Sequence, residues 1–236
     1  MSEEEIPLAG GRVTTGVVRI GDTVRRPMAS DRTLQQDFLR FLQARGFAGA
    51  PRFLGRDEKG REILSFLPGQ VPDDLGHYED GQLAAAARLL RAFHDAGSGF
   101  AAAAAAGAET MCHNDWGPPN AVFRDGLPWA MIDFDTLQPG ARLWDLGYSA
   151  FAWLDLGNED YAGAEQGRRL QLFAAAYDRI DCDAAAIAAY AVARQTALAV
   201  WATARGQTAM VDWARRCAAW TVRHLLERLN PTGFPR

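Results

Sequence analysis

Lysine is nearly absent from this chain. Lys59 is the only lysine among 25 basic residues, so almost every positive charge is carried by arginine. Cysteine is also scarce, and the three cysteines are far apart, without the spacing typical of metal ligands. We therefore expect buried or idle thiols in a reducing cytoplasm rather than a disulfide framework. These three positions are Cys112, Cys182 and Cys217.

Long apolar runs and concentrated charge are missing as well. No stretch of 18 or more apolar residues is present, and the N-terminus lacks the basic region and apolar core of a signal peptide. A net charge of -4 over 236 residues gives no basic footprint for nucleic acid or an anionic membrane. We expect a cytoplasmic protein with neither of these partners. The oligomeric state leaves no signal in the sequence.

Two hairpins and one helix are expected in the first 66 residues. Gly21-Asp22 and Asp57-Glu58-Lys59-Gly60 are turn signals between short runs of strand-forming residues. Between the hairpins, apolar residues recur at helical spacing over residues 33–45, and Gly46 ends that pattern.

Beyond residue 69 the pattern becomes mainly helical. Leu67-Pro68-Gly69 interrupts the strands, so we expect an N-terminal lobe (1–66), a hinge (67–69) and a C-terminal lobe (70–236). In the C-terminal lobe a helix is expected near 83–96, a small hairpin near 121–132, and several packed helices from about 163 to 229. The six alanines at 101–106 are compatible with a helix or with a surface connection.

Chemistry is concentrated in two segments, which read His-Asn-Asp-Trp-Gly-Pro-Pro-Asn (113–120) and Ile-Asp-Phe-Asp (132–135). Asp115 and Asn120 stand near the two ends of a loop that Gly117-Pro118-Pro119 stiffens. Asp133 follows one hairpin later, so the two strands can return it to the side of Asn120. Two carboxylates and a carboxamide near one point suit magnesium held jointly with phosphates. Zinc would require more histidine or cysteine than His113 provides.

These segments match a known pattern. His-x-Asp-x4-Asn is the catalytic loop of protein kinases, and Asp-Phe-Asp corresponds to their metal-binding Asp-Phe-Gly. With Leu-Trp-Asp-Leu-Gly-Tyr at 143–148, the chain resembles the aminoglycoside phosphotransferase and choline kinase superfamily, over roughly residues 10–155. The resemblance implies an α+β, two-lobed protein-kinase-like fold. Its N-lobe would be a small antiparallel sheet with one helix, and its C-lobe would be larger and mainly helical.

The resemblance also implies roles. Asp115 would be catalytic, because it would accept or orient the proton of the acceptor hydroxyl. Asn120 and Asp133 would hold Mg2+ against the phosphates of ATP or GTP. His113 would be structural and pack behind the metal-binding aspartate. Asp145 would brace the catalytic loop or, alternatively, cap a helix. Asp135 would support the site or face solvent.

One position departs from the superfamily pattern. The strand that grips the nucleotide in kinases carries lysine, but Lys59 lies in a hairpin turn. Arg25 or Arg26 must replace it, and we prefer Arg25, because arginine binds phosphate oxygens bidentately. The acidic partner of this arginine would be Asp37, on the helix of residues 33–45.

Two further segments are expected at the nucleotide. Gly10 and Gly11 open a glycine-rich stretch that either lies against the phosphates or forms an ordinary turn; no P-loop motif is present. Ser65, Phe66 and Leu67 at the hinge would offer backbone groups to the purine. The Phe66 ring would either enclose the purine or pack within the hinge.

Together these features indicate an ATP-dependent kinase that phosphorylates a hydroxyl of a small molecule. A nucleotide-binding pseudoenzyme without turnover is the alternative. A magnesium-dependent phosphohydrolase would use the same carboxylates but leaves the sheet lobe unexplained. Acidic residues between 155 and 183 suit a cationic acceptor, such as an aminoglycoside or a choline-like amine, or form a solvated helical face. The acceptor and the choice of ATP or GTP stay open.

Overall fold

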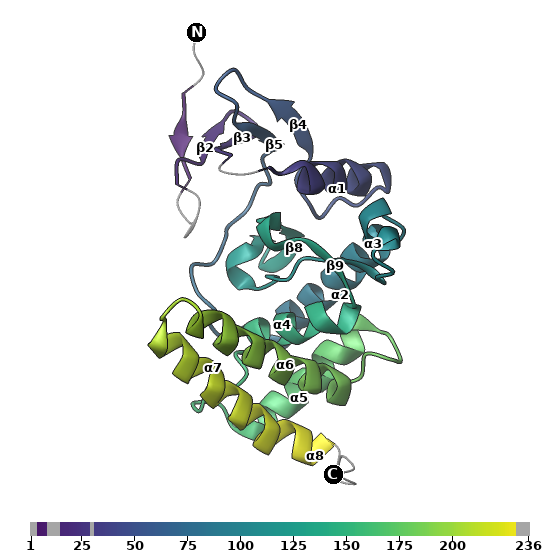
Figure 1. Ribbon diagram of the computed structural model, residues 1–236, viewed down its shortest axis with the longest axis vertical. Coiled ribbons are helices and arrows are strands. Elements are labelled where there is room, and N and C mark those ends of the chain that lie inside the picture. The colour runs from purple at the N-terminus through teal and green to yellow at the C-terminus, as the bar shows by residue number, and fades with distance from the viewer. Residues whose placement is uncertain (1–3, 9–14, 29–30, 230–236) are drawn as a thin grey trace.

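A small sheet lies above a larger set of helices in the computed structural model (Figure 1), which describes residues 4–8, 15–28 and 31–229. The sheet has five antiparallel strands in the order β1-β2-β3-β5-β4. Its strands are β1 (Ile6–Pro7), β2 (Val18–Ile20), β3 (Thr23–Arg26), β4 (Phe53–Arg56) and β5 (Glu62–Ser65). The two hairpins predicted from the sequence are therefore present.

The turns of this sheet follow from their residues. Gly21 has φ +55°, in the left-handed region that glycine occupies without steric cost. In the β4–β5 turn, the Asp57 carboxylate accepts hydrogen bonds from the backbone N–H groups of Lys59 (3.0 Å) and Arg61 (2.9 Å). Lys59 is exposed and forms an ion pair with Glu5, which places the only lysine far from any phosphate-binding role.

Helix α1 (Thr33–Ala44) connects the sheet to the rest of the molecule. Its apolar face is buried, and the Phe38 ring lies edge-on against Phe93 of α2 (Asp80–Gly97), with ring centroids 5.7 Å apart. One continuous apolar cluster therefore runs from α1 through α2 to Trp116, in the loop that follows β6 (Thr110–Cys112). This packing stabilises the position of the sheet over the helices.

After β5 the chain is anchored to a third hairpin, formed by β7 (Ala121–Arg124) and β8 (Leu127–Met131). Gln70 exchanges two backbone hydrogen bonds with Phe123, at 2.9 and 2.7 Å. Gly69, with φ +149°, permits this approach, because a Cβ atom there would lie 2.2 Å from the Phe123 carbonyl oxygen.

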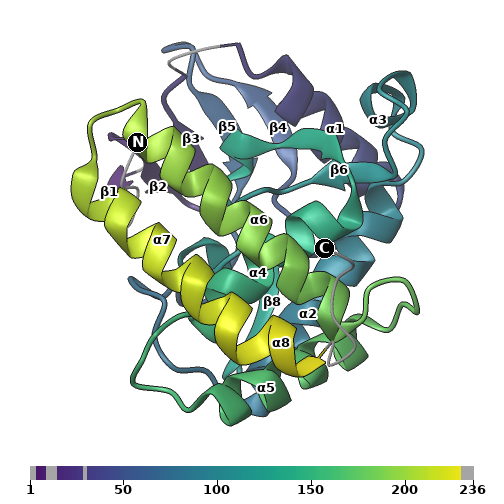
Figure 2. The ribbon, with the colours of Figure 1, turned by 60° about the horizontal axis from the view of Figure 1, so that its bottom comes forward.

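The remaining elements pack around α2 and the hairpin. Figure 2 shows α6 and α7 side by side across the helical lobe, and both views place α4 close to α6. The alanine run is helical, and a short strand pair that we did not predict, β6 with β9, precedes and follows the catalytic segments. These elements are α3 (Ala101–Ala105), β6 (Thr110–Cys112), η1 (Pro118–Asn120), η2 (Phe134–Thr136), β9 (Gln138–Gly140), α4 (Arg142–Leu154), α5 (Gly163–Tyr177), α6 (Ala184–Thr203), α7 (Thr208–Thr221), a π-helical turn (Val222–Leu226) and α8 (Glu227–Leu229).

Helix α6 is long and apolar enough, by length and composition alone, to cross a membrane. It contains Arg194 and Gln195, so it is not the uninterrupted apolar run that the sequence analysis looked for. In the structure α6 packs against both α4 and α7, which accounts for its many small apolar residues. The approach to α4 is close: a Cβ atom at Gly147 would lie 2.5 Å from the backbone of Tyr190. All three cysteines are free and buried.

Candidate active site

The loop of residues 113–117, which was predicted to be the catalytic loop, is held by Asp145 on α4. The Asp145 carboxylate is fully buried and accepts hydrogen bonds from the backbone N–H groups of His113 (2.7 Å) and Asn114 (2.8 Å). Asn114 has φ +65°, so this loop needs such anchoring to hold its backbone. The bracing contacts that we expected of Asp145 are present. Burial alone would raise the pKa of Asp145, but the hydrogen bonds from His94 and the loop outweigh it and lower that pKa.

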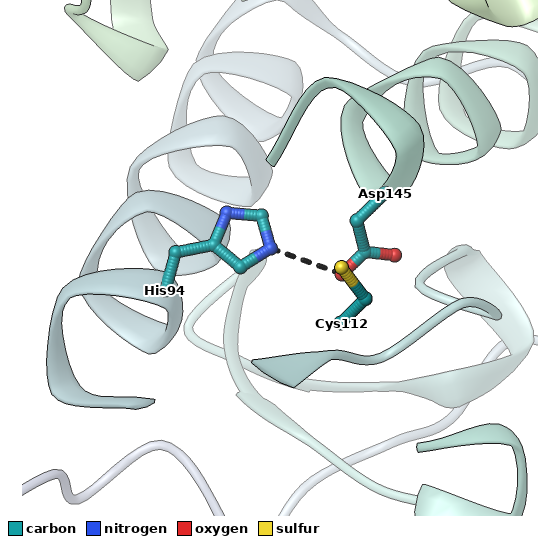
Figure 3. Close-up of side chains that lie close together, drawn as sticks. All are labelled: His94, Cys112 and Asp145. Atoms are coloured by element: carbon teal, nitrogen blue, oxygen red, sulfur yellow. Dashed lines mark hydrogen bonds and ion pairs between the residues drawn. The ribbon is translucent and has the colours of Figure 1, made fainter. Parts of the chain in front are cut away.

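His94 of α2 completes this buried cluster (Figure 3). Its Nε2 lies 3.0 Å from Asp145 Oδ2, and its Nδ1 lies 2.8 Å from the Tyr177 hydroxyl. Burial lowers the pKa of His94, so the ring is neutral, with Nε2–H donating to Asp145 and Nδ1 accepting from Tyr177. Cys112 lies beside the pair, and the three residues are close enough to hold a metal. Because the Asp145 oxygens already accept these hydrogen bonds, we interpret the cluster as a structural brace.

Asp115 lies at the turn of the loop, with both carboxylate oxygens hydrogen-bonded. Asn120 Nδ2 donates to Asp115 Oδ2 at 2.9 Å and to the Asp115 carbonyl oxygen at 2.8 Å. The Tyr148 hydroxyl, from α4, donates to Asp115 Oδ1. The carboxylate is thus held by groups from η1 and from α4, and its orientation does not depend on the loop alone.

Asn120 and Asp133 are brought together by the β7–β8 hairpin. The backbone N–H of Ile132 donates to the Asn120 carbonyl oxygen at 2.9 Å, which places Asp133 at the next position. Asp133 has φ +61° and begins η2, so its side chain leaves the strand at a sharp turn. Since Asn120 donates through Nδ2, its Oδ1 is left as an acceptor, with no hydrogen bond from any residue that the structure describes. One carboxamide oxygen and one carboxylate fit the few protein ligands that magnesium takes when phosphates supply others.

His113 lies behind this hairpin. Its ring is fully buried, Nε2 lies 3.0 Å from the Ile132 carbonyl oxygen, and its centroid lies 5.0 Å from that of Phe134. These contacts agree with the structural role that the resemblance implies.

An arginine from the sheet reaches Asp133 and Asp135. Arg26 of β3 donates from Nη1 to Asp135 Oδ1 at 2.6 Å and from Nη2 to Asp135 Oδ2 and, at 3.3 Å, to Asp133 Oδ1. Arg32, just before α1, also donates to Asp135 and, at 2.8 Å, to the buried Glu62. Asp135 thus connects the sheet to the helical lobe through two arginines.

The pKa values of Asp133 and Asp135 shift in opposite directions because the two arginines bind mainly Asp135. Burial and then the neighbouring Asp135 charge raise the pKa of Asp133, and Arg26 offsets this only in part. Burial would also raise the pKa of Asp135, but Arg26 and then Arg32 outweigh it and lower that pKa. Asp133 therefore carries an electrostatic penalty that an added cation would relieve.

Comparison with known proteins agrees with this geometry. Residues 98–182 match the model of the phosphotransferase enzyme family. The trifolitoxin immunity protein of Rhizobium leguminosarum bv. trifolii is 33% identical over 166 residues, a match that spans 64% of this chain and 62% of that protein.

Solved structures align over almost the whole chain. Choline kinase from Cryptosporidium parvum Iowa II has a TM-score of 0.66 at 13% identity, covering 98% of this chain and 91% of its own. For the GDP complex of aminoglycoside 2'-phosphotransferase-IIIa the TM-score is 0.59 at 13% identity, with coverage of 94% and 93%. This chain has the fold of the aminoglycoside phosphotransferase and choline kinase superfamily. The α+β, protein-kinase-like fold predicted from the sequence is confirmed.

Within this superfamily fold, the structure corrects the position of the arginine. Residues that are adjacent in a strand point to opposite sides, and the register pairs Arg26 with the buried Glu62. Arg25 therefore points the other way, where it donates to Thr23 Oγ1 (2.6 Å) and lies 3.8 Å from Asp57. The side chain that reaches Asp133 and Asp135 is Arg26, one residue after the Arg25 that we preferred.

Asp37, the predicted acidic partner of the arginine, also points away from the site. Asp37 is exposed on α1 and pairs with Arg40 at 2.8 Å. The α1 side chain that points inward is Gln36, which donates to Glu62 at 2.8 Å. The buried carboxylate on this side of the sheet thus comes from β5, and Asp37 does not contact Arg26.

The hinge and the glycine-rich stretch were the other predicted nucleotide contacts. Ser65 accepts a hydrogen bond from the Arg52 backbone (2.9 Å), and the Arg19 guanidinium lies 3.8 Å from the centre of the Phe66 ring. Phe66 thus packs against the sheet, and Leu67 is half-buried. Gly10 and Gly11 lie outside the described residues.

Several residues of the site were not found from the sequence. Tyr148 and Arg194 flank Asp115 from α4 and α6, and Arg32 shares Asp135. One feature of the sequence could have pointed to His94: it is the only histidine in the helix predicted at 83–96. Tyr148 ends the Leu-Trp-Asp-Leu-Gly-Tyr motif, but the motif gave it no role, and Arg32 and Arg194 belong to no motif.

Proposed function

We propose that this protein transfers the γ-phosphoryl group of a magnesium nucleotide, ATP or GTP, to a hydroxyl of a small molecule. The observation that carries the proposal is the rigid placement of Asp115 beside the Asn120–Asp133 pair. Asn120 contacts Asp115 directly (2.9 Å) and adjoins Asp133 through the hairpin. A single framework therefore fixes both the acid–base group and the metal ligands, as phosphoryl transfer requires.

The reaction assigns a part to each residue. Asn120 Oδ1 and Asp133 would hold Mg2+, which supplies charge neutralisation for the phosphates. The acceptor oxygen bonds to the γ-phosphorus while the bond from phosphorus to the bridging oxygen breaks, leaving a nucleoside diphosphate. Asp115 orients the acceptor hydroxyl and receives its proton. Arg26, which already lies against Asp133 and Asp135, is placed to bind phosphate oxygens.

The acidic residues between 155 and 183 give little support to a cationic acceptor. Asp155 accepts from Asn158 Nδ2 at 2.8 Å, Glu165 pairs with Arg168 at 2.7 Å, and Asp183 caps α6. These carboxylates are engaged locally, as on an ordinary helical face. Beside Asp115 lies instead a cation, Arg194. We therefore favour a neutral or anionic acceptor over a polycationic one.

The test is a panel of hydroxylated compounds incubated with magnesium-ATP or magnesium-GTP, with products detected by mass spectrometry. Toxins and macrolide antibiotics belong in the panel because one relative is an immunity protein and one structural neighbour is a macrolide 2'-phosphotransferase. GTP belongs in it because one structural neighbour was solved with GDP. We expect phosphorylation of at least one acceptor by the parent, and none by Asp133→Asn.

The outcome that contradicts the proposal is equally definite. A parent that binds the nucleotide but phosphorylates nothing would be a nucleotide-binding pseudoenzyme. Such a result would be explained by the Arg26–Asp135 ion pair, which would have to open before Arg26 reached a phosphate.

A further inference from the structure

Asp115 is held by more than its own loop. Asn120 occupies one carboxylate oxygen, Oδ2, and the Tyr148 hydroxyl occupies the other, Oδ1. A carboxylate oxygen has two acceptor sites, so each one retains a lone pair after one hydrogen bond. The direction of those remaining lone pairs is set by both donors together.

Tyr148 is placed by the same helix that braces the loop. It follows Asp145 by three residues on α4, so both side chains lie on one face of that helix. Asp145 binds the backbone at His113 and Asn114, while Tyr148 binds the Asp115 side chain. One helical turn therefore fixes the backbone and the carboxylate of the catalytic loop independently.

The Tyr148 ring is itself restrained on two sides. The Phe151 ring lies edge-on to it, with centroids 6.3 Å apart and an interplanar angle of 83°. The Arg194 guanidinium lies 4.9 Å from its centre and donates from Nη2 to the Asn114 carbonyl oxygen at 2.7 Å. Arg194 thus binds the ring and the loop at once, so the hydroxyl has little freedom to leave Asp115. Burial, and then the Asp115 charge, raise the pKa of Tyr148, which keeps the hydroxyl protonated as a donor.

We propose that Tyr148 is a positioning residue for phosphoryl transfer: its hydroxyl holds the Asp115 carboxylate so that a remaining lone pair faces the acceptor hydroxyl. This inference rests on the proposed function. The proton still passes from the acceptor to Asp115, and Tyr148 neither gains nor loses one. A geometric restraint of this kind acts on turnover, because the acceptor hydroxyl must be aligned with a fixed carboxylate as the new bond forms.

The substitution that tests this is Tyr148→Phe, because it removes the hydroxyl and keeps the ring that contacts Arg194 and Phe151. Tyr78→Phe is the matched control: Tyr78 is buried, Tyr148 is half-buried, and the Tyr78 hydroxyl donates to the Asp74 backbone at 3.4 Å, away from Asp115. Turnover is measured with water as acceptor (magnesium-ATP hydrolysis) and with any acceptor from the panel. Nucleotide Kd is measured by titration calorimetry with magnesium-ATP.

We expect Tyr148→Phe to lower kcat by roughly 10- to 100-fold, as for loss of a hydrogen bond to a charged group, with the nucleotide Kd within about twofold of the parent. Tyr78→Phe should leave both unchanged. In an Asp115→Ala background, Tyr148→Phe should have no further effect on kcat, because Tyr148 acts through Asp115. The same pair should show coupling of about three- to tenfold in the unfolding equilibrium constant, which does not depend on activity.

Four results would overturn the inference. Parental kcat in Tyr148→Phe would remove the positioning role, and a raised kcat would make Tyr148 a group that the acceptor displaces. Additive effects of the Tyr148 and Asp115 substitutions on kcat and on unfolding would mean that the hydrogen bond does not act. If the parent itself turns over neither water nor any acceptor, the proposed function fails and the positioning role fails with it. The unfolding measurement still reports the hydrogen bond in that case.

Discussion

Replacement of Arg26 by alanine would test how the sheet lobe contributes to the site. Arg26 is the side chain of β3 that reaches across to Asp133 and Asp135, whereas Arg25 points away. Removing Arg26 leaves Asp135 with Arg32 alone and removes the arginine that offsets the Asp135 charge at Asp133. The nucleotide phosphates would also lose the arginine that we propose takes the place of the missing lysine.

The magnitude can be worked out from the exposure of the groups. Breaking a fully buried ion pair costs about 3–5 kcal/mol. The Arg26 side chain is only 11% exposed, but Asp135 is 35% exposed and retains Arg32, so solvent screens part of that loss. We expect the free energy of unfolding to fall by about 1–2 kcal/mol. Loss of a bidentate contact to phosphate should weaken nucleotide binding by roughly 10- to 100-fold.

The assay is calorimetric titration of magnesium-ATP into the parent, Arg26→Ala and Arg25→Ala, together with urea denaturation of all three. Arg25→Ala is the matched control, because it removes the same side chain one residue earlier in β3. It should change nucleotide affinity by less than about threefold, since Arg25 lies against Thr23 and Asp57. Equal losses in the two variants, or a greater loss for Arg25→Ala, would refute the assignment to Arg26.

Four further predictions follow from the site and its supports. Asp133→Asn should weaken magnesium-dependent nucleotide binding at least roughly tenfold by calorimetry, because it removes a charged ligand. Asp115→Asn should lower turnover by roughly 10²–10⁴-fold with nucleotide affinity almost unchanged, and turnover of an acceptor at the parental rate would remove its catalytic role. Gly147→Ala should lower the unfolding free energy by about 1–3 kcal/mol, since a Cβ atom there would meet the α6 backbone at 2.5 Å. Because His94 is held neutral in the fold, stability should fall with decreasing pH below about 6.5, by up to about 1.4 kcal/mol per unit, and His94→Gln should flatten that dependence.

The sign of the last effect is fixed by the direction of the shift. The pKa of His94 is lower in the folded protein than its ordinary value of 6.5, so the unfolded chain binds the additional proton as the pH falls. Urea denaturation between pH 5 and 7.5 measures this slope in a range above the ordinary pKa values of aspartate and glutamate. A parent whose stability is constant over that range would contradict the neutral, buried state of the ring.

The local part of the site was accessible from the sequence because a single short hairpin creates it. Asp115, Asn120 and Asp133 are separated by one loop and two strands, and strand pairing alone returns the third residue to the second. The α+β, protein-kinase-like fold was predictable from the motif resemblance, and the two hairpins of the sheet from their turn residues. The predicted lobe boundaries and the assigned roles remain predictions.

The contacts that were missed depend on how distant segments pack. To choose between Arg25 and Arg26, one must know which face of β3 points toward the site. Side chains alternate along a strand, so an error of one residue selects the wrong face. Asp37 was named as the acidic partner, but it lies on the exposed side of α1, and the inward face of α1 is known only once α1 is packed in the fold. Tyr148 contacts Asp115 across 33 residues of sequence, and no local spacing reports such a contact.

The site is therefore supported in two physically different ways. In the helical lobe, Asp145 and His94 brace the loop through hydrogen bonds that are fully buried, so the loop is held with little dependence on solvent or salt. Between the lobes, Arg26 and Arg32 bind Asp135, a partly exposed carboxylate whose ion pairs weaken as salt rises. The phosphates of an incoming nucleotide compete for arginine but cannot replace a buried hydrogen bond to the loop backbone. The geometry at Asp115 is consequently fixed before the nucleotide arrives, whereas the contact of the sheet with Asp135 is the part that a bound nucleotide can rearrange.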